Sequence, residues 1–591
     1  MTTKRRQGFF QPKTLAIAIA LGTAAPAYAV TFNIGEIEGQ FDSALSVGAS
    51  WAMDDPDMDL VGAANGGTGY TQTGDDGRLN FKKGETFSKI FKGVHDLELR
   101  YGDSGAFIRG KYWYDFELKD ESRLFKDISD SNRKEAAQSS GAEILDAFLY
   151  HNYYLGDLPG TVRIGRQVVS WGESTFIGNS INAINPLDAA AFRRPGAEIK
   201  EGLIPVNMLY VSQSLTDQLS MEAFYQLEWD QTIVDNCGTF FAGADVVADG
   251  CDMNYNILDE ATVNTLLALP ASTRAALGIN VEEEGLLVRR GGDRDARDSG
   301  QYGVAFRWLA DAAEYGVYFM NYHSRTPNLS MRNANAAAIT AALRTPALAS
   351  PILLSNGEYF LEYPEDIRLY GASFATTLPT GTAWSGEISY RPNMPVQINT
   401  TDMTGRLARS VAGAAAVGGV PAALAQAGVE QRGYNRKEVT QLQTTFTHFI
   451  DQVLGAGRVT LVGEIGYTHV GGLESKSELR YGRDSIYGLD TPEYGNDGFV
   501  TANSWGYRLR ALANYSNVFA GINLTPNVSF SHDVDGYGPV FNEGSKAVSI
   551  GVDAEYQNTY TAGLSYTDFF GGDYNTLTDR DFLAFSVGVN F

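Results

Sequence analysis

The chain has 591 residues, a formal net charge of −24 and 64 glycines, 31 tyrosines and 31 phenylalanines. No basic block interrupts this acidity, which argues against a nucleic-acid binder, and two cysteines are too few for a disulfide scaffold or a structural zinc site. Glycine at about 11% against the usual ~7%, together with the tyrosines and phenylalanines, favours many strands joined by turns.

Residues 1–29 have the features of a cleaved signal peptide. Four basic residues precede an apolar stretch at 14–25, which is too short to span a bilayer, and Ala27-Tyr28-Ala29 forms a small-x-small cleavage site. The alternative is a membrane-anchor helix. We expect export, a mature chain that begins near Val30 with a net charge of −28, and a single domain over 30–591.

Apolar and polar residues alternate along most of the mature chain. On a strand predicted at 105–117, Arg109, Lys111, Asp115 and Glu117 share one face, opposite Ile108, Tyr112 and Tyr114. The same period of two, which is typical of β-strands, recurs at 219–229, 384–391, 505–513, 518–530, 550–556, 560–566 and 583–591. The last of these ends on Phe591, which resembles the assembly signal of bacterial outer-membrane barrels.

Two further features favour a membrane barrel over a soluble sandwich. Aromatic residues occupy predicted strand ends, namely Trp229, Trp505, Tyr515, Tyr556 and Tyr560. Tight turns near 102–105, 155–160, 215–218, 309–314, 378–382, 451–457 and 557–559 alternate with long segments such as 230–300, 325–366, 392–437 and 470–502. Short periplasmic turns, long outer loops and aromatic girdles are the pattern of an antiparallel transmembrane β-barrel, here of roughly 18 strands (about 16–20) in the bacterial outer membrane.

Three alanine-rich stretches predict helical inserts in the long loops: Leu258–Gly278, Asn333–Leu343 and Gly405–Gly428. They are either solvated surface elements or caps that constrict the barrel mouth. The stretch Val411–Gly428 is the best candidate for a helical membrane span after the signal, but it is built from alanine and glycine and broken by Pro421, so insertion would be weak. We therefore expect the chain to cross the membrane with strands.

A charged segment at about 170–203 lacks clean alternation, and we predict that it folds into the lumen as a plug or constriction. Two interpretations of its charges stay open: a structural salt-bridge network, or tuning of passage through the pore. The strands at 105–117 and 384–391 also place charges of both signs on the polar face. The candidate lumen residues are Arg109, Lys111, Arg163, Arg166, Trp171, Glu173, Arg193, Arg194, Glu387 and Arg391.

Cys237 and Cys251 lie in a predicted outer loop, and export to an oxidising compartment favours a disulfide between them. A closed loop of this size would stabilise the fold by about 3 kcal/mol. The acidic clusters at 54–59 and 293–295 offer oxygen ligands for calcium, but their spacing does not match an EF-hand, and solvated loops are the preferred interpretation. We predict no metal and no cofactor.

Catalysis is not indicated. The six histidines, His95, His151, His323, His448, His469 and His532, are scattered, and no G-x-S-x-G elbow accompanies them. A serine hydrolase would need a serine, a histidine and an orienting carboxylate or amide in convergence. We therefore predict that the protein is not an enzyme.

Five short runs resemble a known family: 163–174 (RIGRQVVSWGES), 181–186 (INAINP), 193–196 (RRPG), 321–325 (NYHSR) and 387–393 (EISYRPN). The chain resembles, over essentially its whole mature length, a proteobacterial family of exported barrels known only as a domain of unknown function. Genes of this family often neighbour those of an outer-membrane lipoprotein and of exporters of the resistance-nodulation-division superfamily. This association implies export or uptake of hydrophobic compounds.

The sequence and the resemblance together predict an outer-membrane channel or transporter for small hydrophobic or amphipathic, lipid- or steroid-like molecules. A general diffusion porin, and a closed barrel that serves as a structural or docking partner of an export system, are the alternatives. The expected partners are outer-membrane lipid, the small-molecule cargo, a periplasmic-facing lipoprotein and an inner-membrane exporter, and no nucleic acid.

Overall fold

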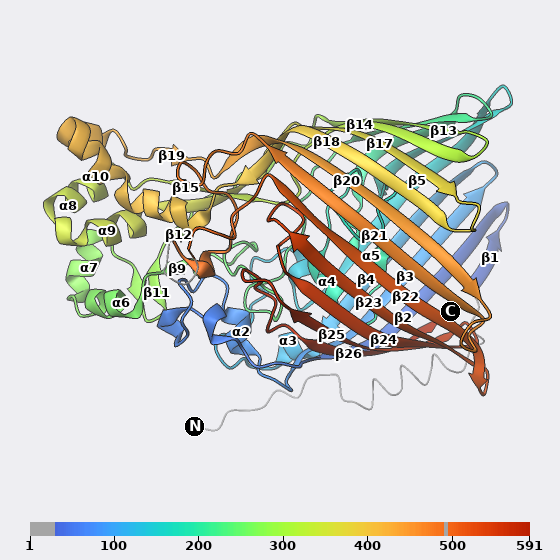
Figure 1. Ribbon diagram of the computed structural model, residues 1–591, viewed down its shortest axis with the longest axis horizontal. Helices are drawn as coiled ribbons and strands as arrows, with labels where there is room; N and C mark the ends of the chain where they lie inside the picture. The colour runs from blue at the N-terminus through green and yellow to red at the C-terminus, as the bar shows by residue number, and fades with distance from the viewer. Residues whose placement is uncertain (1–29, 490–494) are drawn as a thin grey trace.

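The computed structural model describes residues 30–489 and 495–591, so the predicted signal peptide lies outside the described residues. Within that part of the chain, eighteen antiparallel strands close into one barrel (Figure 1), as predicted. In order around the wall they are β2 (Ile37–Ala52), β3 (Thr86–Tyr101), β4 (Ser104–Asp115), β5 (Ser140–Leu155), β6 (Leu158–Gln167), β7 (Val206–Ser214), β8 (Leu219–Gln226), β13 (Gln301–Leu309), β14 (Ala313–Tyr322), β17 (Ile367–Thr377), β18 (Ala383–Gln397), β20 (Tyr434–Asp451), β21 (Arg458–Gly471), β22 (Asn503–Phe519), β23 (Ile522–Asp535), β24 (Lys546–Tyr556), β25 (Tyr560–Phe570) and β26 (Phe582–Asn590).

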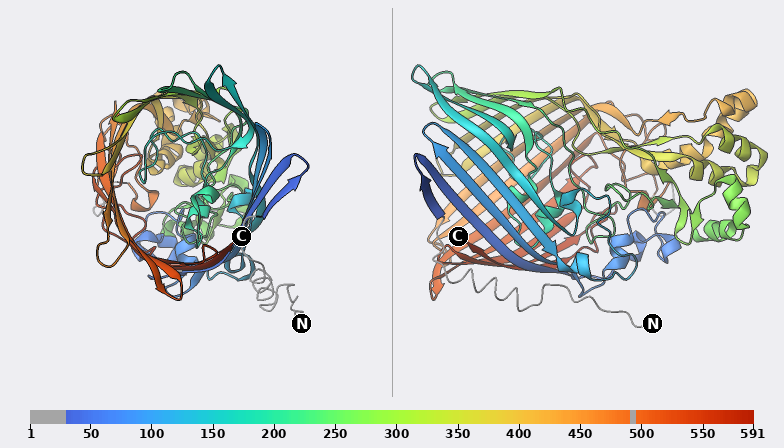
Figure 2. Two further views of the ribbon diagram at one scale, coloured as in Figure 1. Left: turned by 90° about the vertical axis from the view of Figure 1, so that its right-hand side faces the viewer. Right: turned by 180° about the vertical axis from the view of Figure 1, so that it is seen from behind.

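The ring closes where β26 pairs with β2, from Asn590 opposite Ala44 to Phe582 opposite Ala52. A nineteenth strand, β1 (Val30–Ile34), pairs with the first residues of β2, on the side that β26 occupies farther along. The β1–β2 hairpin therefore extends beyond the ring, and Figure 2 shows it splayed away from the barrel wall.

The two ends of the barrel differ, as the sequence predicted. Tight turns join the strands at the end that also carries Val30 and Phe591 (Figure 1). The opposite end carries the long segments 53–85, 116–139, 168–205, 227–300, 323–366, 398–433, 472–489 with 495–502, 536–545 and 571–581. Short turns mark the periplasmic end of such barrels and long loops the outer end.

The alternation of apolar and polar side chains along each strand explains why the barrel lies in a membrane. On β26, Phe585 and Val587 are exposed on the outside of the ring, whereas Ser586 faces inward and touches Gly196. Large apolar side chains are exposed in the same way on other strands, including Leu442, Phe446, Ile465, Leu509 and Ile550. A closed sheet satisfies every backbone donor and acceptor in hydrocarbon, and its apolar outer band faces lipid. The protein is an outer-membrane β-barrel.

Three details of the predicted strands were wrong. The apolar row at 518–530 is not one strand, because a tight turn at Ala520–Gly521, where both residues have positive φ, separates β22 from β23. The strand at 105–117 ends at Asp115, whose side chain caps the short helix α3 (Phe116–Asp120), so Glu117 is helical. Trp229 lies beyond the end of β8 and is buried against Tyr363, so it belongs to the outer loops and not to an aromatic girdle.

The long loops build a packed outer domain beyond the barrel mouth (Figure 1). Its β-structure comprises β9 (Asn256–Ile257), β10 (Val281–Glu282) and β11 (Gly285–Leu287) in one sheet, and β12 (Arg289–Arg290), β15 (Asn328–Arg332), β16 (Glu358–Glu362) and β19 (Glu430–Gln431) in another. Its helices are α6 (Glu260–Leu267), α7 (Ala271–Leu277), α8 (Ala336–Arg344), α9 (Ala349–Asn356) and α10 (Thr400–Leu424). A single turn of 3₁₀ helix at Pro346–Leu348 connects α8 to α9 in this domain. Elsewhere in the loops lie α2 (Asp76–Asn80) and single turns of 3₁₀ helix at Met58–Leu60, Ala63–Asn65, Glu135–Ala137 and Ser485–Tyr487.

The alanine-rich stretches form helices in this outer domain, α6 and α7 from the first, α8 from the second and α10 from the third. Helix α10 is, within the described residues, long and apolar enough to cross a membrane. It follows β18 and precedes β20 at the outer end of the barrel (Figure 1), so it belongs to an outer loop. A disulfide joins Cys237 and Cys251 in the long segment 227–300, with Cα atoms 6.4 Å apart.

Candidate functional site: a segment folded into the lumen

The chain between β6 and β7, residues 168–205, folds inside the barrel (Figure 2), and we call it the inward segment. Its first lobe, 168–185, contains no helix or strand. Its second lobe, 186–205, contains two short helices, α4 (Ala189–Arg193) and α5 (Ile199–Gly202). The sequence 168–205 lacks the alternation that a wall strand needs, which is why the ring continues from β6 to β7 while this segment turns inward.

Two carboxylates of the barrel wall hold the first lobe by its backbone. Glu464 of β21 accepts hydrogen bonds from the N–H groups of Thr175 at 3.0 Å, Phe176 at 2.6 Å and Ile177 at 2.7 Å. Glu387 of β18 accepts from the N–H groups of Glu173 and Ile181, the latter at 3.3 Å. Both carboxylates are buried, so these are charge-assisted hydrogen bonds within the protein interior.

The close approach at Glu387 explains a glycine of the SWGES run. Gly172 has φ of +91°, and a Cβ added there would lie 2.4 Å from a carboxylate oxygen of Glu387. Any other residue would be strained by the backbone angle and would push the carboxylate off the lobe. The run therefore includes a residue whose small size the anchoring geometry requires.

Apolar side chains of the first lobe complete its attachment. Trp171, Ile181 and Ile184 are almost fully buried in a cluster with residues of β7, β8, β13, β14 and β17. The Trp171 indole N–H donates to Glu222 of β8 at 2.7 Å. The lobe thus has a core of its own against one side of the wall, and Trp171 is part of that core.

The second lobe is held by wall lysines. Lys92 of β3 donates to the Gly196 carbonyl at 2.7 Å and to the Glu201 carboxylate at 2.5 Å. Lys111 of β4 donates to Asp188 at 3.0 Å, and Asp188 also caps α4 by accepting from the Ala191 N–H. These side chains are buried, so both ion pairs are shielded from water.

The other predicted lumen residues are distributed around the wall and do not converge on one point. Arg109 pairs with Asp96 at 2.7 Å and with Asp146 at 3.3 Å, and Arg163 stacks 4.1 Å from the Tyr210 ring centre. Four others contact neighbouring segments: Arg166 with the Pro205 carbonyl, Arg193 with Asp235, Arg194 with the Ala136 carbonyl and the Trp113 ring, and Arg391 with the Ser180 carbonyl. Glu173 lies 3.9 Å from Arg307.

Sequence reasoning missed four residues that hold the inward segment: Lys92, Asp188, Glu222 and Glu464. A usable signal existed for Glu464, because it is the one carboxylate of its strand and lies between the outward-facing Leu461 and Ile465. Its partners are about 290 positions away in sequence, so the residues near Glu464 could not reveal which N–H groups it binds.

A cavity lies on each side of the inward segment. The outer cavity has a volume of about 540 Å³ and is lined by Asn182, Asn185 and Leu187 of the segment together with Arg325, Met394 and Val396. On the periplasmic side, two cavities of about 240 and 290 Å³ share Ala44, Val94, Glu198 and Asn590 as lining residues. The inward segment contributes residues to both sides and therefore separates an outer from an inner compartment of the lumen.

Arg325 connects the outer cavity to the segment. Its guanidinium donates to the Ile184 carbonyl at 3.0 Å, to the Asp230 carbonyl at 3.0 Å and to the Gln226 side chain. Burial lowers the pKa of Arg325 to about 10. This value is still well above neutral pH, so the side chain stays charged. A permanent positive charge therefore lies in the wall of the outer cavity.

A different arc of wall, β22 to β25, faces the lumen with polar and small side chains, among them Arg510, Asn527, Ser529, Asp553 and Gly563. Arg510 and Asp553 are exposed, and Asn527 donates to Asp553 at 3.0 Å. We call this the polar arc. Water in the lumen reaches these side chains, in contrast to buried anchors such as Glu464 on the neighbouring strand β21.

The family model for "Protein of unknown function (DUF1302)" matches residues 11–591. The chain belongs to this family. No curated protein matches the chain. The resemblance read from the SWGES, INAINP and NYHSR runs is thereby confirmed.

Among solved structures, OccAB1 of Acinetobacter baumannii is similar at 10% identity and a TM-score of 0.39, covering 96% of this chain and 98% of that one. OpdK of Pseudomonas aeruginosa has 9% identity and a TM-score of 0.39, with 94% and 98% covered. A BenF-like porin of Pseudomonas fluorescens Pf-5 has 7% identity and a TM-score of 0.40, also with 94% and 98% covered.

Proposed function

We propose that this DUF1302 protein passes small amphipathic molecules across the outer membrane, along the polar arc and around the inward segment. The observation that carries the proposal is the pair of compartments, one of about 540 Å³ on the outer side and others of about 240 and 290 Å³ on the periplasmic side, with the inward segment between them. A closed barrel with no transport role would not require a lumen segment that lines a cavity on each of its two sides.

The outer cavity supports an amphipathic cargo because its lining is divided. Leu187, Ile367, Met394, Pro395 and Val396 supply an apolar surface. Asn182, Asn185, Asn328 and Arg325 supply hydrogen-bond donors and acceptors. Pockets for organic ligands are commonly built in this way, with an apolar surface that binds the body of a ligand and a few polar groups that orient it.

The mechanism needs no energy source within the barrel. The closed wall excludes lipid, the outer cavity concentrates the cargo, and the charged side chains of the polar arc set the preference for ions and polar groups. The anchored inward segment narrows the lumen and so limits the size of the molecules that pass. Because the contacts of its two lobes with the wall fix its position, weakening those contacts should raise that size limit.

The β1–β2 hairpin favours a second candidate, a barrel that docks a partner of an export system. Among the described residues β1 pairs with β2 alone, so its other edge offers backbone donors and acceptors on the periplasmic side. Val30 and Ile34 are exposed beside that edge. Extended segments of other proteins bind to such edges by adding a strand.

The test is single-channel conductance of refolded protein of residues 30–591 in planar bilayers, with and without an amphipathic probe such as a bile salt. The proposal expects steady conductance that the probe blocks reversibly, and a weaker block in Met394→Asp because a charge replaces part of the apolar lining. Val417→Asp is the matched control, since Val417 is 94% exposed on α10 and lies outside the cavity.

Each other outcome selects an alternative. Conductance that the probe leaves unchanged, with free passage of sugars in liposome swelling, would identify a general diffusion porin. A folded barrel without conductance would contradict the proposal, and periplasmic proteins captured by the wild type but not by a chain that lacks residues 30–36 would then identify a docking barrel.

A further inference from the structure

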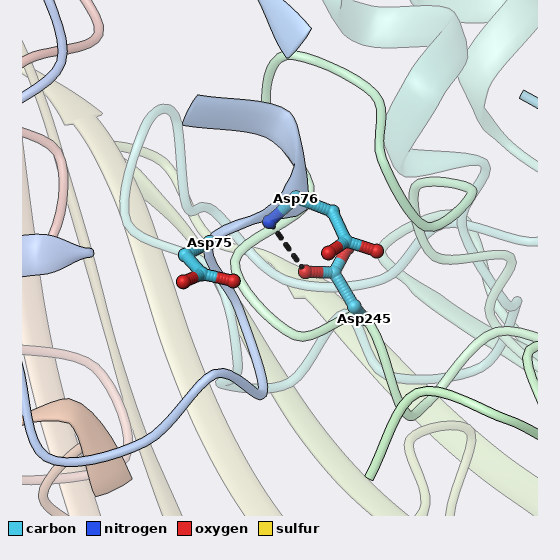
Figure 3. A group of neighbouring side chains, drawn as sticks. All are labelled: Asp75, Asp76 and Asp245. Carbon is cyan, nitrogen blue, oxygen red and sulfur yellow. Dashed lines mark hydrogen bonds between the residues drawn. The ribbon is translucent and has the colours of Figure 1, made fainter. Parts of the chain in front are cut away.

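Outside the lumen, three aspartates from two distant loops meet in the protein interior. Asp75 and Asp76 lie at the start of α2 in segment 53–85, and Asp245 lies in segment 227–300. One carboxylate oxygen of each lies within 4.8 Å of the other two (Figure 3). Asp75 and Asp245 are 0% exposed and Asp76 is 2% exposed. We call these residues the aspartate triad.

An unpartnered oxygen points to a missing ligand. Asp75 accepts hydrogen bonds at Oδ2 from the Gly62 N–H at 2.9 Å and from the Asn65 amide at 3.0 Å. Its Oδ1 is buried and has no hydrogen-bond donor. Figure 3 shows an oxygen of the Asp75 carboxylate facing the Asp245 carboxylate. A buried carboxylate oxygen without a donor costs free energy unless another electrophilic group binds it.

The surrounding charges leave the triad short of positive partners. Lys126 donates to Asp76 at 3.0 Å but also pairs with Glu284 at 2.5 Å, so it is shared between two carboxylates. Two nearby arginines are committed elsewhere: Arg78 and Arg580 both pair with Asp579, and their remaining N–H groups donate to main-chain carbonyls or to Asp579 again. Asp75 and Asp245 form no ion pair among the described residues.

This shortage has an electrostatic signature. Burial raises the pKa of Asp75 and Asp245, and burial raises the pKa of Asp76 to about 6. The neighbouring carboxylates add to the shift at Asp76 and Asp245. A divalent cation would remove the mutual repulsion and supply the charge that the arginines do not.

We propose that the aspartate triad binds one Ca²⁺ ion among the outer loops. Carboxylate oxygens are the ligands of Ca²⁺, at about 2.3–2.6 Å, so one ion can contact three oxygens with this separation. Asp76 and Asp245 keep lone pairs beyond the hydrogen bonds that they accept. Mg²⁺ retains several waters and rarely occupies a site with three buried carboxylates, so Ca²⁺ is the better match.

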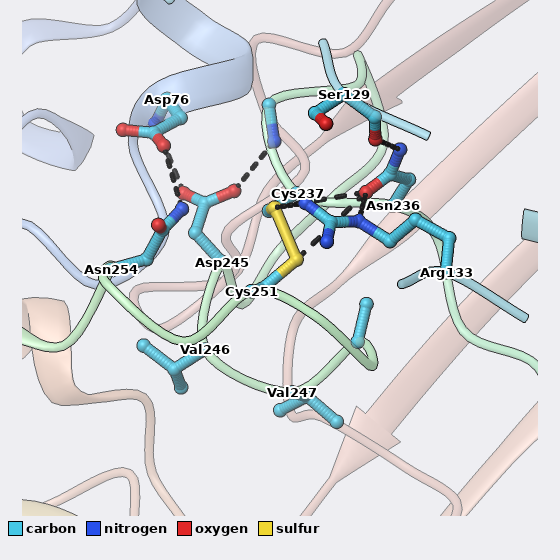
Figure 4. Close-up of a disulfide and its surroundings, with 12 residues drawn as sticks. Asp76, Ser129, Arg133, Asn236, Cys237, Asp245, Val246, Val247, Cys251 and Asn254 are labelled. Carbon is cyan, nitrogen blue, oxygen red and sulfur yellow. Dashed lines mark hydrogen bonds between the residues drawn. A yellow bond between two sulfur atoms is a disulfide. The ribbon is translucent and has the colours of Figure 1, made fainter. Parts of the chain in front are cut away.

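The ion would join two outer loops at the barrel mouth, and a third loop is attached beside it. Asp245 accepts hydrogen bonds from the Asp76 N–H at 3.1 Å and the Gly238 N–H at 2.9 Å, inside the loop that the Cys237–Cys251 disulfide closes (Figure 4). Arg78, one turn along from Asp75, connects the same place to Asp579 in segment 571–581. The inference is independent of the proposed function, because none of the three aspartates lines the described lumen cavities.

The experiment uses the refolded mature barrel, stripped with EDTA, and titrates it with CaCl₂ and separately with MgCl₂ by isothermal calorimetry. We expect one saturable Ca²⁺ site per chain, at least tenfold weaker Mg²⁺ binding, and a higher thermal unfolding temperature with Ca²⁺. Asp75→Asn and Asp245→Asn should each weaken Ca²⁺ binding at least tenfold. Asp252→Asn is the matched control, because Asp252 lies in the same loop with an exposed side chain.

Two results would overturn the proposal. The first is that the wild-type protein binds no Ca²⁺ with defined stoichiometry at millimolar concentration, although its heat-modifiable gel mobility shows that it is folded. The other is wild-type affinity in both folded triad variants, which would locate the ion at another acidic surface. If either variant does not fold, the wild-type titration and Tb³⁺ luminescence with Ca²⁺ competition still decide the question.

Discussion

The two lobes of the inward segment are attached to the barrel wall by opposite chemistry. In the first lobe, wall carboxylates accept hydrogen bonds from the segment's backbone, with Glu464 serving Thr175, Phe176 and Ile177. In the second lobe, wall lysines donate to the segment's own carboxylates and carbonyls, as Lys111 does to Asp188.

The difference explains why the attachment of the second lobe left a charge signal in the segment's own sequence, whereas the attachment of the first lobe did not. The second lobe carries its charges in its own side chains, which produced the charged cluster at 188–201. The first lobe contributes N–H groups, which every residue except proline has. We also expect different sensitivities, because two wall carboxylates accept the backbone N–H groups of the first lobe, whereas several separate ion pairs hold the second lobe.

The largest expected effect is that of Glu464→Ala. The change leaves three backbone N–H groups of the first lobe without acceptors, at about 1–3 kcal/mol for each buried group. We expect a loss of stability of about 5 kcal/mol by that reckoning and a larger single-channel conductance, because the lobe is released from the wall. Glu478→Ala, at an exposed position in an outer loop, is the control. Unchanged conductance in a folded Glu464→Ala barrel would contradict the anchoring role.

The second lobe should respond to a broken ion pair and recover when both partners are removed. Lys111→Met alone leaves Asp188 buried and unpaired, at about 3–5 kcal/mol. The double variant Lys111→Met/Asp188→Asn should be more stable than Lys111→Met, and urea unfolding of both single variants and the double variant measures the coupling. Additive losses would mean that the two side chains do not interact in the folded barrel.

Arg193→Ala/Arg194→Ala tests whether these two arginines hold the lobe or tune passage. Both line a small cavity of about 70 Å³ beside Trp113 and are absent from the lining of the periplasmic-side cavities. We expect a loss of stability of about 2 kcal/mol, because the change removes an ion pair, two hydrogen bonds to carbonyls and two cation–π contacts, all of them partly exposed. The reversal potential in a salt gradient should stay unchanged, and a clear shift would instead support a role in ion selectivity.

Substitutions on the polar arc should have the smallest effect on stability but a clear effect on ion selectivity. Arg510 is exposed to the lumen, so Arg510→Ala should change stability by less than about 0.5 kcal/mol. Removing a positive charge from the lumen should move the reversal potential toward cation preference, and Asp553→Asn should move it the other way. Equal reversal potentials in both variants would mean that ions do not pass along this arc.

Much of the barrel could be predicted from local pattern, because each strand displays its own inside and outside every second residue. The pattern was misread at the turn between β22 and β23. Ala520 lies in that turn but continues the apolar row from Val518 to Ile522, so the period of two could not reveal that the chain reverses there. At 105–117 the alternation likewise continues past the last strand residue into α3.

By itself the sequence determined the barrel, its orientation, the family and the presence of an unusual charged segment, since these depend on residues near one another in the chain. Only the tertiary structure decided which wall residues hold that segment and which aspartates share a site. Glu464 meets Ile177, and Asp76 meets Asp245, across separations of 287 and 169 residues. Closing the ring brings such positions together, and the energies of their contacts depend on burial that no local pattern encodes.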